Sequence, residues 1–307
     1  MKRVLVTGGA GFIGSNTVDL LLGRGYDVSV VDDLSTGRRG NLNPGSSFHR
    51  CDITSKALDG VFRRERPDAV VHLAAQINVR MSIEEPGFDA MVNVLGTLNV
   101  LESARRHGVS KVVYSSSGGA VYGEPKYNPV DEDHPVKPIC PYGASKYAGE
   151  KILEVYGGLH GLDYNIVRYG NVYGPRQDPR GEAGVAAIFT GLLLKGKRPT
   201  IFGDGRQSRD FCFVGDVAEA NLAALKRKGR SRVYNIGSGE ETSVNELTAR
   251  LTAAVGADLK PKHGPAVAGE VKRIFLDVSR ARRELRWKPM TGLDEGLDAT
   301  VGWVRDA

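Results

Sequence analysis

The glycine-rich segment TGGAGFIG, residues 7–14, lies between a short apolar run and a helical pattern that extends to Leu22. Gly9, Gly11 and Gly14 have the spacing G-x-G-x-x-G. A turn of this kind lets a pyrophosphate approach bare backbone, and the helix N-terminus behind it attracts anions. Because the glycines stand between a strand and a helix, they predict a dinucleotide-binding Rossmann unit at the start of the chain.

An acidic pair, Asp32 and Asp33, ends the second apolar run. Asp32 stands 18 residues after Gly14, where a carboxylate accepts hydrogen bonds from the hydroxyls of an adenosine ribose. A carboxylate at this place repels a 2′-phosphate, so the pattern favours NAD over NADP. Asp52 follows the next expected strand, near Phe48, and two interpretations of it stay open: an adenine contact or a turn residue.

Short apolar runs alternate with amphipathic segments through the first half of the chain. Strands buried on both faces and separated by helices are typical of a parallel, doubly wound sheet, and right-handed crossovers place helices over both faces. We therefore predict an α/β Rossmann-type fold, with strands over residues 4–6, 28–31, near 48, 69–73, 111–115 and 164–167 and long helices over 86–107 and 142–160.

Beyond about residue 170 glycine and proline cluster and the alternation loosens. Helices are predicted at 184–195, 214–228, 243–255 and 292–305. We expect residues 1–170 to form the dinucleotide-binding domain, with some later segments returning to it, and residues 171–307 to form mainly a smaller α/β lobe that binds the substrate.

Composition excludes several classes of protein. The 307 residues are 41% hydrophobic and 25% charged, as in ordinary globular proteins, and the net charge is +6. The densest basic cluster, residues 226–232, is interpreted as a solvated helix end, so nucleic acid is not the expected partner. No apolar run is long enough for a membrane span, and the three cysteines form no CxxC pair. We expect a cytoplasmic protein with reduced cysteines, no metal site and no membrane partner.

A tyrosine and a lysine four residues apart, Tyr142 and Lys146, project from one face of a predicted helix. Tyrosine has a pKa of about 10, and a nearby ammonium and a cationic nicotinamide would favour its phenolate. Lowering the pKa by roughly three units takes about 4 kcal/mol. In isolation the pair is typical of a helix surface. It gains weight from the dinucleotide motif and from a serine-rich strand end, SSSGG at 115–119, at the carboxyl edge of the sheet where ligands bind.

Taken together, these motifs make the chain similar to the extended short-chain dehydrogenase/reductase superfamily, within it to the NAD-dependent epimerase/dehydratase family, and most of all to UDP-glucose 4-epimerases. The resemblance runs through essentially the whole chain. It rests on TGGAGFIG (7–14), DDLSTG (32–37), HLAAQ (72–76), NVLGTLNVLE (93–102), SSSGGAVYG (115–123), PYGASK (141–146), RYGNVYGPRQ (168–177) and RDFCFVGDVAEA (209–220).

The resemblance implies a tightly bound, recycled NAD and a catalytic set of Tyr142 as base and acid, Lys146 on the nicotinamide ribose, and Ser117 as the hydroxyl partner. Ser116 stays an alternative to Ser117, because the glycine stretch behind it is one residue longer than in many members. The implied cofactor-binding residues are Gly8, Gly11, Phe12, Ile13, Gly14, Asp32, Asp33, Ser35, Thr36, Gly37, Asp52, Ile53, Leu73, Ala74, Ala75, Gln76, Asn93, Ser115, Ser116, Tyr142, Lys146 and Tyr169.

For the substrate, the resemblance implies a UDP-hexose held by Ser117, Tyr142, Asn171, Val185, Phe202 and Arg209. One departure concerns Val267, which stands where relatives often carry an arginine that reaches the pyrophosphate. Lys272 or Arg273 is the candidate replacement, or the nucleotide binds differently. The residue that limits the sugar is expected near Ile274.

The residues after the catalytic serine separate the possible reactions. Dehydratases and decarboxylases of the superfamily place acidic residues there, whereas this chain has Gly118 and Gly119, which cannot transfer protons. The resemblance therefore implies an isomerase that interconverts UDP-glucose and UDP-galactose through a transient 4-keto sugar. The alternatives are an epimerase of UDP-N-acetylglucosamine or UDP-glucuronate, and a non-catalytic NAD-sensing protein. It also implies a homodimer joined through the helices near 87–107 and 142–160.

Overall fold

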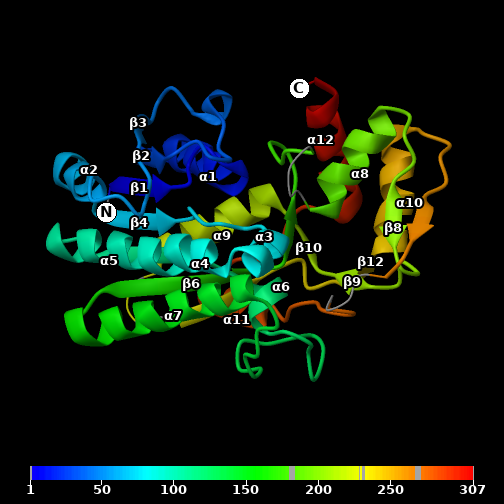
Figure 1. Ribbon diagram of the computed structural model, residues 1–307. Coiled ribbons are helices and arrows are strands. Elements are labelled where there is room, and N and C mark those ends of the chain that lie inside the picture. Colours follow the sequence, from blue (N-terminus) through cyan, green and yellow to red (C-terminus); the bar gives the residue numbers. More distant parts are fainter. Residues whose placement is uncertain (1, 180–183, 228, 230–231, 267–270, 307) are drawn as a thin grey trace.

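The computed structural model describes residues 2–179, 184–227, 229, 232–266 and 271–306. A large α/β layer and a smaller lobe lie side by side, with the chain passing repeatedly between them (Figure 1). The carboxyl ends of the central strands point toward the smaller lobe, and that edge therefore becomes the floor of any site between the two parts.

The core of the large layer is a parallel sheet of seven strands in the order β11-β6-β5-β4-β1-β2-β3, which confirms the predicted Rossmann-type fold. Apolar β-branched residues dominate these strands because both faces are covered. The strands are β1 (Arg3–Thr7), β2 (Asp27–Asp32), β3 (Ser47–Arg50), β4 (Ala69–His72), β5 (Lys111–Ser117), β6 (Asp163–Tyr169) and β11 (Arg232–Ile236).

Helices cover both faces of this sheet (Figure 1). One face packs against α1 (Phe12–Gly23), α9 (Val214–Lys226) and α11 (Ser279–Glu284), and the other against α2 (Leu58–Glu65), α5 (Thr97–Arg106) and α7 (Pro141–His160). Alternate strand residues divide between the two cores: Val4 and Val6 point to the first and Leu5 to the second. Shorter turns of helix, η1 (Arg39–Asn41), α3 (Val79–Glu84), α4 (Pro86–Ala90), η2 (Met91–Gly96) and α6 (Gly118–Val121), lie between these elements.

The smaller lobe has its own apolar core, built mainly from α8 (Val185–Leu194), α10 (Val244–Val255) and α12 (Leu293–Asp306). Three short strand pairs complete it or join it to the large layer. These are β7 (Asn171–Tyr173) with β10 (Phe211–Phe213), β9 (Ser208–Arg209) with β12 (Thr242–Ser243), and β8 (Thr200–Phe202) with β13 (Lys262–Gly264).

The predicted helix over 86–107 is wrong in one respect. It consists of α4, one turn of π-helix (η2) and α5, because the side chain of Asn93 is drawn into the loop after β4 while Thr97 Oγ1 donates to the Asn93 carbonyl at 2.7 Å. The other predicted helices agree to within one or two residues, although residue 228 lies outside the described residues. α2, α11 and β11 were not predicted.

α9 and β11 return from the second half of the chain to the large layer. Such returns were expected, whereas the domain boundary at 170/171 stays a prediction. In the part of the chain that the structure describes, every helix is too short or too polar to cross a bilayer.

Candidate active site

The β1–α1 turn can take the backbone of a dinucleotide only because its glycines have no side chains. Gly8 has φ +71°, and a Cβ there would lie 2.7 Å from the amide nitrogen of Ala74. A Cβ on Gly14 would overlap the carbonyl oxygen of Gly8. The glycines therefore let α1 start directly beside the turn, close to the loop after β4.

The N-terminus of α1 is left open to an anion. Its N-cap is Gly11, which has no side chain to satisfy the first amides, and its first turn holds no acidic residue. Phe12 and Ile13 supply the first N–H groups of the helix. Uncapped amides at a helix N-terminus attract phosphate, so this turn fits the pyrophosphate of a dinucleotide.

Asp32 lies at the end of β2, next to this turn and 7% exposed. Its two carboxylate oxygens accept hydrogen bonds from the backbone amides of Ala10, at 3.0 Å, and Leu34, at 2.9 Å. Burial raises its pKa, and the two amides oppose that effect. The adjacent turn residues Ser35, Thr36 and Gly37 are exposed or half-buried. The arrangement fits a ribose at the carboxyl end of β2.

Asp52 and Ile53, which are also predicted to contact the cofactor, have structural roles as well. Asp52 is exposed and accepts a hydrogen bond from the backbone amide of Thr54 at 2.8 Å, as a turn residue does. Ile53 is buried and packs against Gly96 of η2. The structure therefore supports the turn interpretation of Asp52 and leaves its adenine contact a prediction.

The loop after β4, residues 73–76, forms the next wall of the site. The amides of Leu73 and Ala74 both donate to Thr7 Oγ1 at 3.2 Å, which fixes this loop beside the glycine turn. Ala75 is half-buried and Gln76 is buried. Asn93 holds the Gln76 backbone from both sides: its Oδ1 accepts from the Gln76 amide and its Nδ2 donates to the carbonyl, each at 2.9 Å.

The structure brings together the three residues of the predicted catalytic set. Tyr142 and Lys146 lie on one face of α7, and the hydroxyl of Ser117, at the end of β5, lowers the pKa of Tyr142. Lys146 is 3% exposed and its Nζ lies 4.7 Å from the ring centroid of Tyr114. In the described part of the chain no hydrogen bond occupies that ammonium, which leaves its donors for hydroxyl groups of a bound ribose.

The alternation of β5 separates the two candidate serines. Ser116 is 2% exposed and its hydroxyl donates to Glu150 Oε1 at 2.5 Å, on the side of the sheet under α7. The Ser117 hydroxyl lowers the pKa of Tyr142, and the Ser115 hydroxyl lowers that of Tyr169. The geometry favours Ser117 as the hydroxyl partner.

The pKa values of Tyr142 and Lys146 differ from those expected from the sequence. Burial raises the pKa of Tyr142 to about 12, against the lowering effect of the Ser117 hydrogen bond. Burial also lowers the pKa of Lys146 to about 8, while Glu150 and Asp89 oppose that change. The chain alone therefore keeps the phenol protonated, and a cationic group beside the ring is needed to favour the phenolate.

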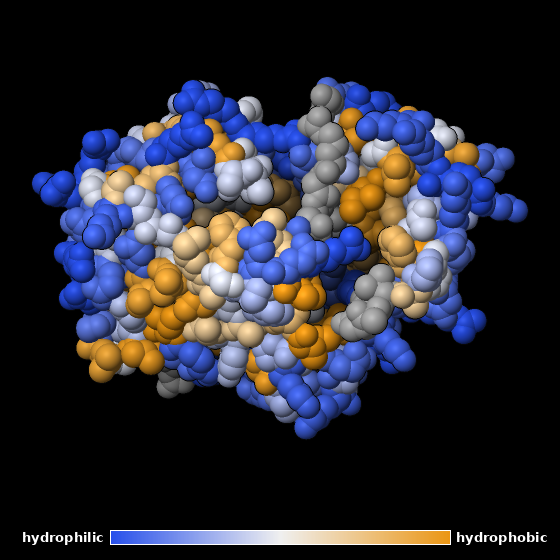
Figure 2. Space-filling model, viewed as in Figure 1, coloured by the Kyte–Doolittle hydropathy of each residue, from blue (hydrophilic) through white to orange (hydrophobic). Residues whose placement is uncertain are grey.

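The surface is hollowed between the large layer and the smaller lobe (Figure 2), and the other predicted substrate residues come from β7, α8, β8 and β9. Asn171 lies near the catalytic serine: a Cβ on Gly119 would lie 3.6 Å from Asn171 Oδ1 and 3.9 Å from Ser117 Oγ. Val185 begins α8 half-buried, and Phe202 ends β8 with 45% of its surface exposed.

Some of the side chains predicted to contact the diphosphate are already bound to other residues of the protein. Arg209 Nη1 donates to the Ser208 carbonyl at 2.8 Å. Arg273 is bound to Glu241 through two contacts of 2.6 Å, so it is occupied, whereas the Lys272 side chain makes no ion pair with a described residue. Val267 lies outside the described residues. Ile274 packs in the core with 2% exposed, so it offers little surface to a sugar.

Two buried carboxylates near the catalytic helix escaped the sequence analysis. Asp89 and Glu150 are 1% and 0% exposed, yet both look like ordinary surface charges of a helix in the sequence. Tyr169, expected near the nicotinamide, is a core residue whose hydroxyl donates to Asn221 Oδ1 at 2.6 Å. No local pattern marks these residues, because their partners come from distant segments.

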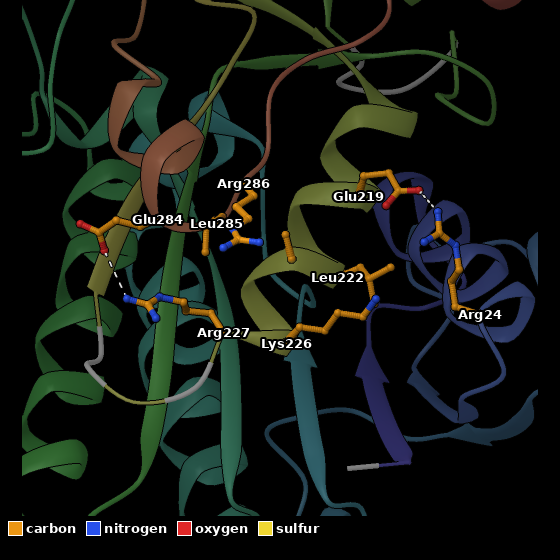
Figure 3. A pocket seen from close by; sticks show the side chains of 9 residues that line it. Arg24, Glu219, Leu222, Lys226, Arg227, Glu284, Leu285 and Arg286 are labelled. Atoms are coloured by element: carbon orange, nitrogen blue, oxygen red, sulfur yellow. Dashed lines mark hydrogen bonds and ion pairs between the residues drawn. The ribbon is translucent and has the colours of Figure 1, made fainter.

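A separate cavity of about 340 Å³ lies at the other end of the sheet, where α1, α9 and α11 terminate (Figure 3). Helices run opposite to the strands they follow, so their C-termini are far from the carboxyl edge that holds Tyr142. The charged groups that line this cavity are largely paired: Arg24 with Glu219 at 2.6 Å and Arg227 with Glu284 at 3.8 Å. This agrees with the interpretation of the basic cluster as a helix end.

An uncapped glycine turn, a buried acid at the end of β2 and a Tyr–Lys pair on one helix face beside a serine-bearing strand end are together typical of the short-chain dehydrogenase/reductase class. Within that class, the model of the NAD dependent epimerase/dehydratase family matches residues 4–237. The chain belongs to this family, and NAD is the cofactor that its site takes.

Individual relatives agree over nearly the whole length. The UDP-glucose 4-epimerase of Mycolicibacterium smegmatis is 47% identical over 309 residues, 99% of each chain. The crystal structure of the UDP-glucose 4-epimerase of Thermotoga maritima with UDP-glucose has a TM-score of 0.97 at 46% identity, and that of Thermus thermophilus with NAD has 0.95 at 44%. Both structures match over 99% of each chain.

Proposed function

We propose that this chain is a UDP-glucose 4-epimerase, which interconverts UDP-glucose and UDP-galactose. The observation that carries the proposal is that two glycines, Gly118 and Gly119, follow Ser117 at the end of β5, where the Ser117 hydroxyl lowers the pKa of Tyr142. At these two positions the described structure has no acid of the kind that elimination or decarboxylation requires. Relatives of the same length and fold bear the same name, which supports the choice of substrate.

Tyr142 accepts the proton of the sugar C4 hydroxyl and later returns it, while Ser117 holds the oxygen in line through its own hydroxyl. Bound NAD would supply the hydride acceptor and donor for C4, and return of the hydride to the opposite face would invert that carbon. Lys146 binds the ribose beside the ring and adds a positive charge to the cationic surroundings that Tyr142 needs to lose its proton.

Gly118 and Gly119, the small residues after β5, have a second role in this mechanism. A Cβ on Gly118 would lie 2.8 Å from Leu276 Cδ1, so a larger residue there would require the Leu276 side chain to shift. A Cβ on Gly119 would be in ordinary contact with Asn171 Oδ1, at 3.6 Å, and with Ser117 Oγ, at 3.9 Å. Because neither glycine carries a side chain, this end of β5 leaves room beside Ser117 for the oxidised sugar to turn over between the two hydride transfers.

The test is to incubate the purified protein with UDP-galactose, without added NAD, and to follow UDP-glucose by chromatography. We expect turnover from retained cofactor. Tyr142→Phe should lower kcat by about 10²–10⁴-fold, whereas Tyr147→Phe, one turn along the same helix, should keep it. No turnover, with NAD present in the protein, would overturn the choice of substrate and point to UDP-N-acetylglucosamine or UDP-glucuronate. Full activity of Tyr142→Phe would overturn the mechanism.

We also propose that the protein is a cytoplasmic homodimer. Large apolar side chains are exposed on α3, α4, η2 and α7, and Figure 2 shows apolar surface gathered over these helices. They are Ile83, Phe88, Met91, Leu95, Val155 and Leu159, each 41–73% exposed. Pairing these helices with those of a second copy would cover the patch. The described cysteines, Cys51, Cys140 and Cys212, form no disulfide, as in a reducing compartment.

A further inference from the structure

The side chain of Asp89 is an ionisable group that the mechanism above does not use. It lies on α4 and is 1% exposed. Its Oδ1 accepts hydrogen bonds from Gln76 Nε2 at 2.8 Å and from Asn93 Nδ2 at 3.0 Å. Both donors are neutral amides, and in the described structure no cation forms an ion pair with Asp89. Burying a carboxylate without a cationic partner lowers the stability of the fold, so we expect Asp89 to have a role that offsets this cost.

The two amides connect Asp89 to the cofactor side of the cleft and to the catalytic helix. Asn93 holds the backbone of Gln76, in the loop after β4, and its Nδ2 also lies 3.2 Å from Ser145 Oγ on α7. Ser145 directly precedes Lys146. Asp89 thus fixes the amide that joins the loop to the helix turn between Tyr142 and Lys146.

The charge of Asp89 acts on both members of the catalytic pair. It raises the pKa of Lys146 and also that of Tyr142. Glu150 is the other carboxylate that raises the pKa of Lys146, but Arg168 binds it through two contacts of 2.9 and 2.5 Å and so offsets its charge. Asp89 is therefore the carboxylate near Lys146 that no second cation neutralises.

The other titratable groups around the pair give Lys146 no anionic partner. Tyr114, from β5, lies under the ammonium and burial raises its pKa, and burial lowers the pKa of His72, on β4, to about 3, so both are neutral at physiological pH. Cys140, at the N-cap of α7, raises the pKa of Tyr142 only when it is ionised.

We propose that Asp89 is a positioning residue of the active site: its buried carboxylate is the counter-charge of Lys146 and holds Asn93 between the cofactor loop and the catalytic helix. The proposal rests on the function proposed above only for its kinetic readout. Without this charge, both Lys146 and Tyr142 lose their protons at lower pH, because a negative neighbour favours the protonated form of each.

The test replaces Asp89 by Asn in the NAD-loaded protein. Asn keeps an oxygen that accepts from Gln76 and Asn93 and removes only the charge. The matched control is Asp216→Asn, which removes the charge of another buried carboxylate, on α9, whose oxygens accept from the amides of Met290 and Thr291 at 3.0 Å. One readout is the pH profile of kcat/KM with UDP-galactose, and the other is the ultraviolet titration of the Tyr142 phenolate, taken as the difference from Tyr142→Phe.

In Asp89→Asn we expect both limbs of the pH profile and the phenolate titration to move to lower pH by about one unit. In Asp216→Asn and Asp89→Glu we expect the limbs and the titration to stay where they are in the parent protein. A uniform loss of rate with unmoved limbs and titration would overturn the proposal, since a merely structural role predicts that. If the parent lacks activity, the proposed function fails, and the titration still decides the role of Asp89. If Asp89→Asn does not fold, Asp89→Ser gives the same comparison.

Discussion

The ion pair between Glu150 of α7 and Arg168 of β6 ties the catalytic helix to the sheet, and its removal should be costly. The two side chains are 1% and 4% exposed, and the guanidinium makes two contacts with the carboxylate, at 2.9 and 2.5 Å. Arg168 Nη1 also donates to the hydroxyl of Tyr122 at 2.9 Å. Glu150→Gln keeps an oxygen for Ser116 and leaves the guanidinium buried without its counter-ion.

Breaking a buried pair on one side typically costs about 3–5 kcal/mol, because the remaining charge stays desolvated. We therefore expect Glu150→Gln to lower the free energy of unfolding by about 3 kcal/mol. Adding Arg168→Met removes the orphaned charge and should recover most of that loss, since an apolar side chain of similar volume replaces the ion. The coupling energy of the double-mutant cycle should then be at least about 2 kcal/mol.

The assay is urea unfolding at a fixed excess of NAD, followed by tryptophan fluorescence. Trp287 is a suitable reporter because it is 5% exposed and its Nε1 donates to the carbonyl of Asp216 at 2.9 Å. A loss below about 1 kcal/mol for Glu150→Gln would refute the reasoning, and so would a double variant as unstable as the single one. Either result would mean that water or relaxation screens the buried charge.

Three further outcomes are expected. Gly14→Ala should lose retained NAD on gel filtration, because its Cβ would overlap a backbone oxygen of the turn, whereas Gly23→Ala on the same helix, with open space around its Cβ, should keep it. The pKa of Asp68 is lowered to about 2 by backbone amides at the N-terminus, so its contribution to stability is complete above about pH 4 and is lost as pH falls toward 2; an Asp68→Asn variant should show a flatter acid limb in thermal melts. Leu159→Glu, in the exposed patch of α7, should reduce the mass seen by light scattering to one chain, while Met290→Glu, equally exposed elsewhere, should not; an unchanged mass for Leu159→Glu would count against this dimer face.

The sheet could be predicted because its signal is local. Val4, Leu5 and Val6 are apolar without a break since a covered parallel strand buries both its faces, and the structure places them on two different cores. The glycine turn and Asp32 could be predicted for the same reason: each stands at a fixed distance from the first strand. β11 was missed because its five residues follow a basic cluster and resemble a loop.

The turn of π-helix could not be predicted, because distant groups cause it. Asn93 bonds to the loop after β4, and a Cβ on Gly96 would lie 2.7 Å from Ile53 Cδ1, so the helix follows these contacts and not its own propensity. The same holds for the site. Ser116 and Ser117 are equivalent in the sequence, and only the fold distinguishes them: the Ser116 hydroxyl donates to Glu150, whereas the Ser117 hydroxyl lowers the pKa of Tyr142.

The return of α9 and β11 to the sheet has a consequence for evolution by recombination and for the design of chimaeras. A cut after residue 170 would leave β6 as a bare edge and uncover the face of α1 that packs on α9. Exchanging the second half between two relatives by a single crossover would therefore also exchange a strand and a helix of the nucleotide-binding layer. Chimaeras that change the sugar and keep the host's own cofactor layer need several crossovers, one at each passage between the two parts. Substrate preference in such an architecture is expected to change by point substitution in the cleft and not by recombination of whole lobes.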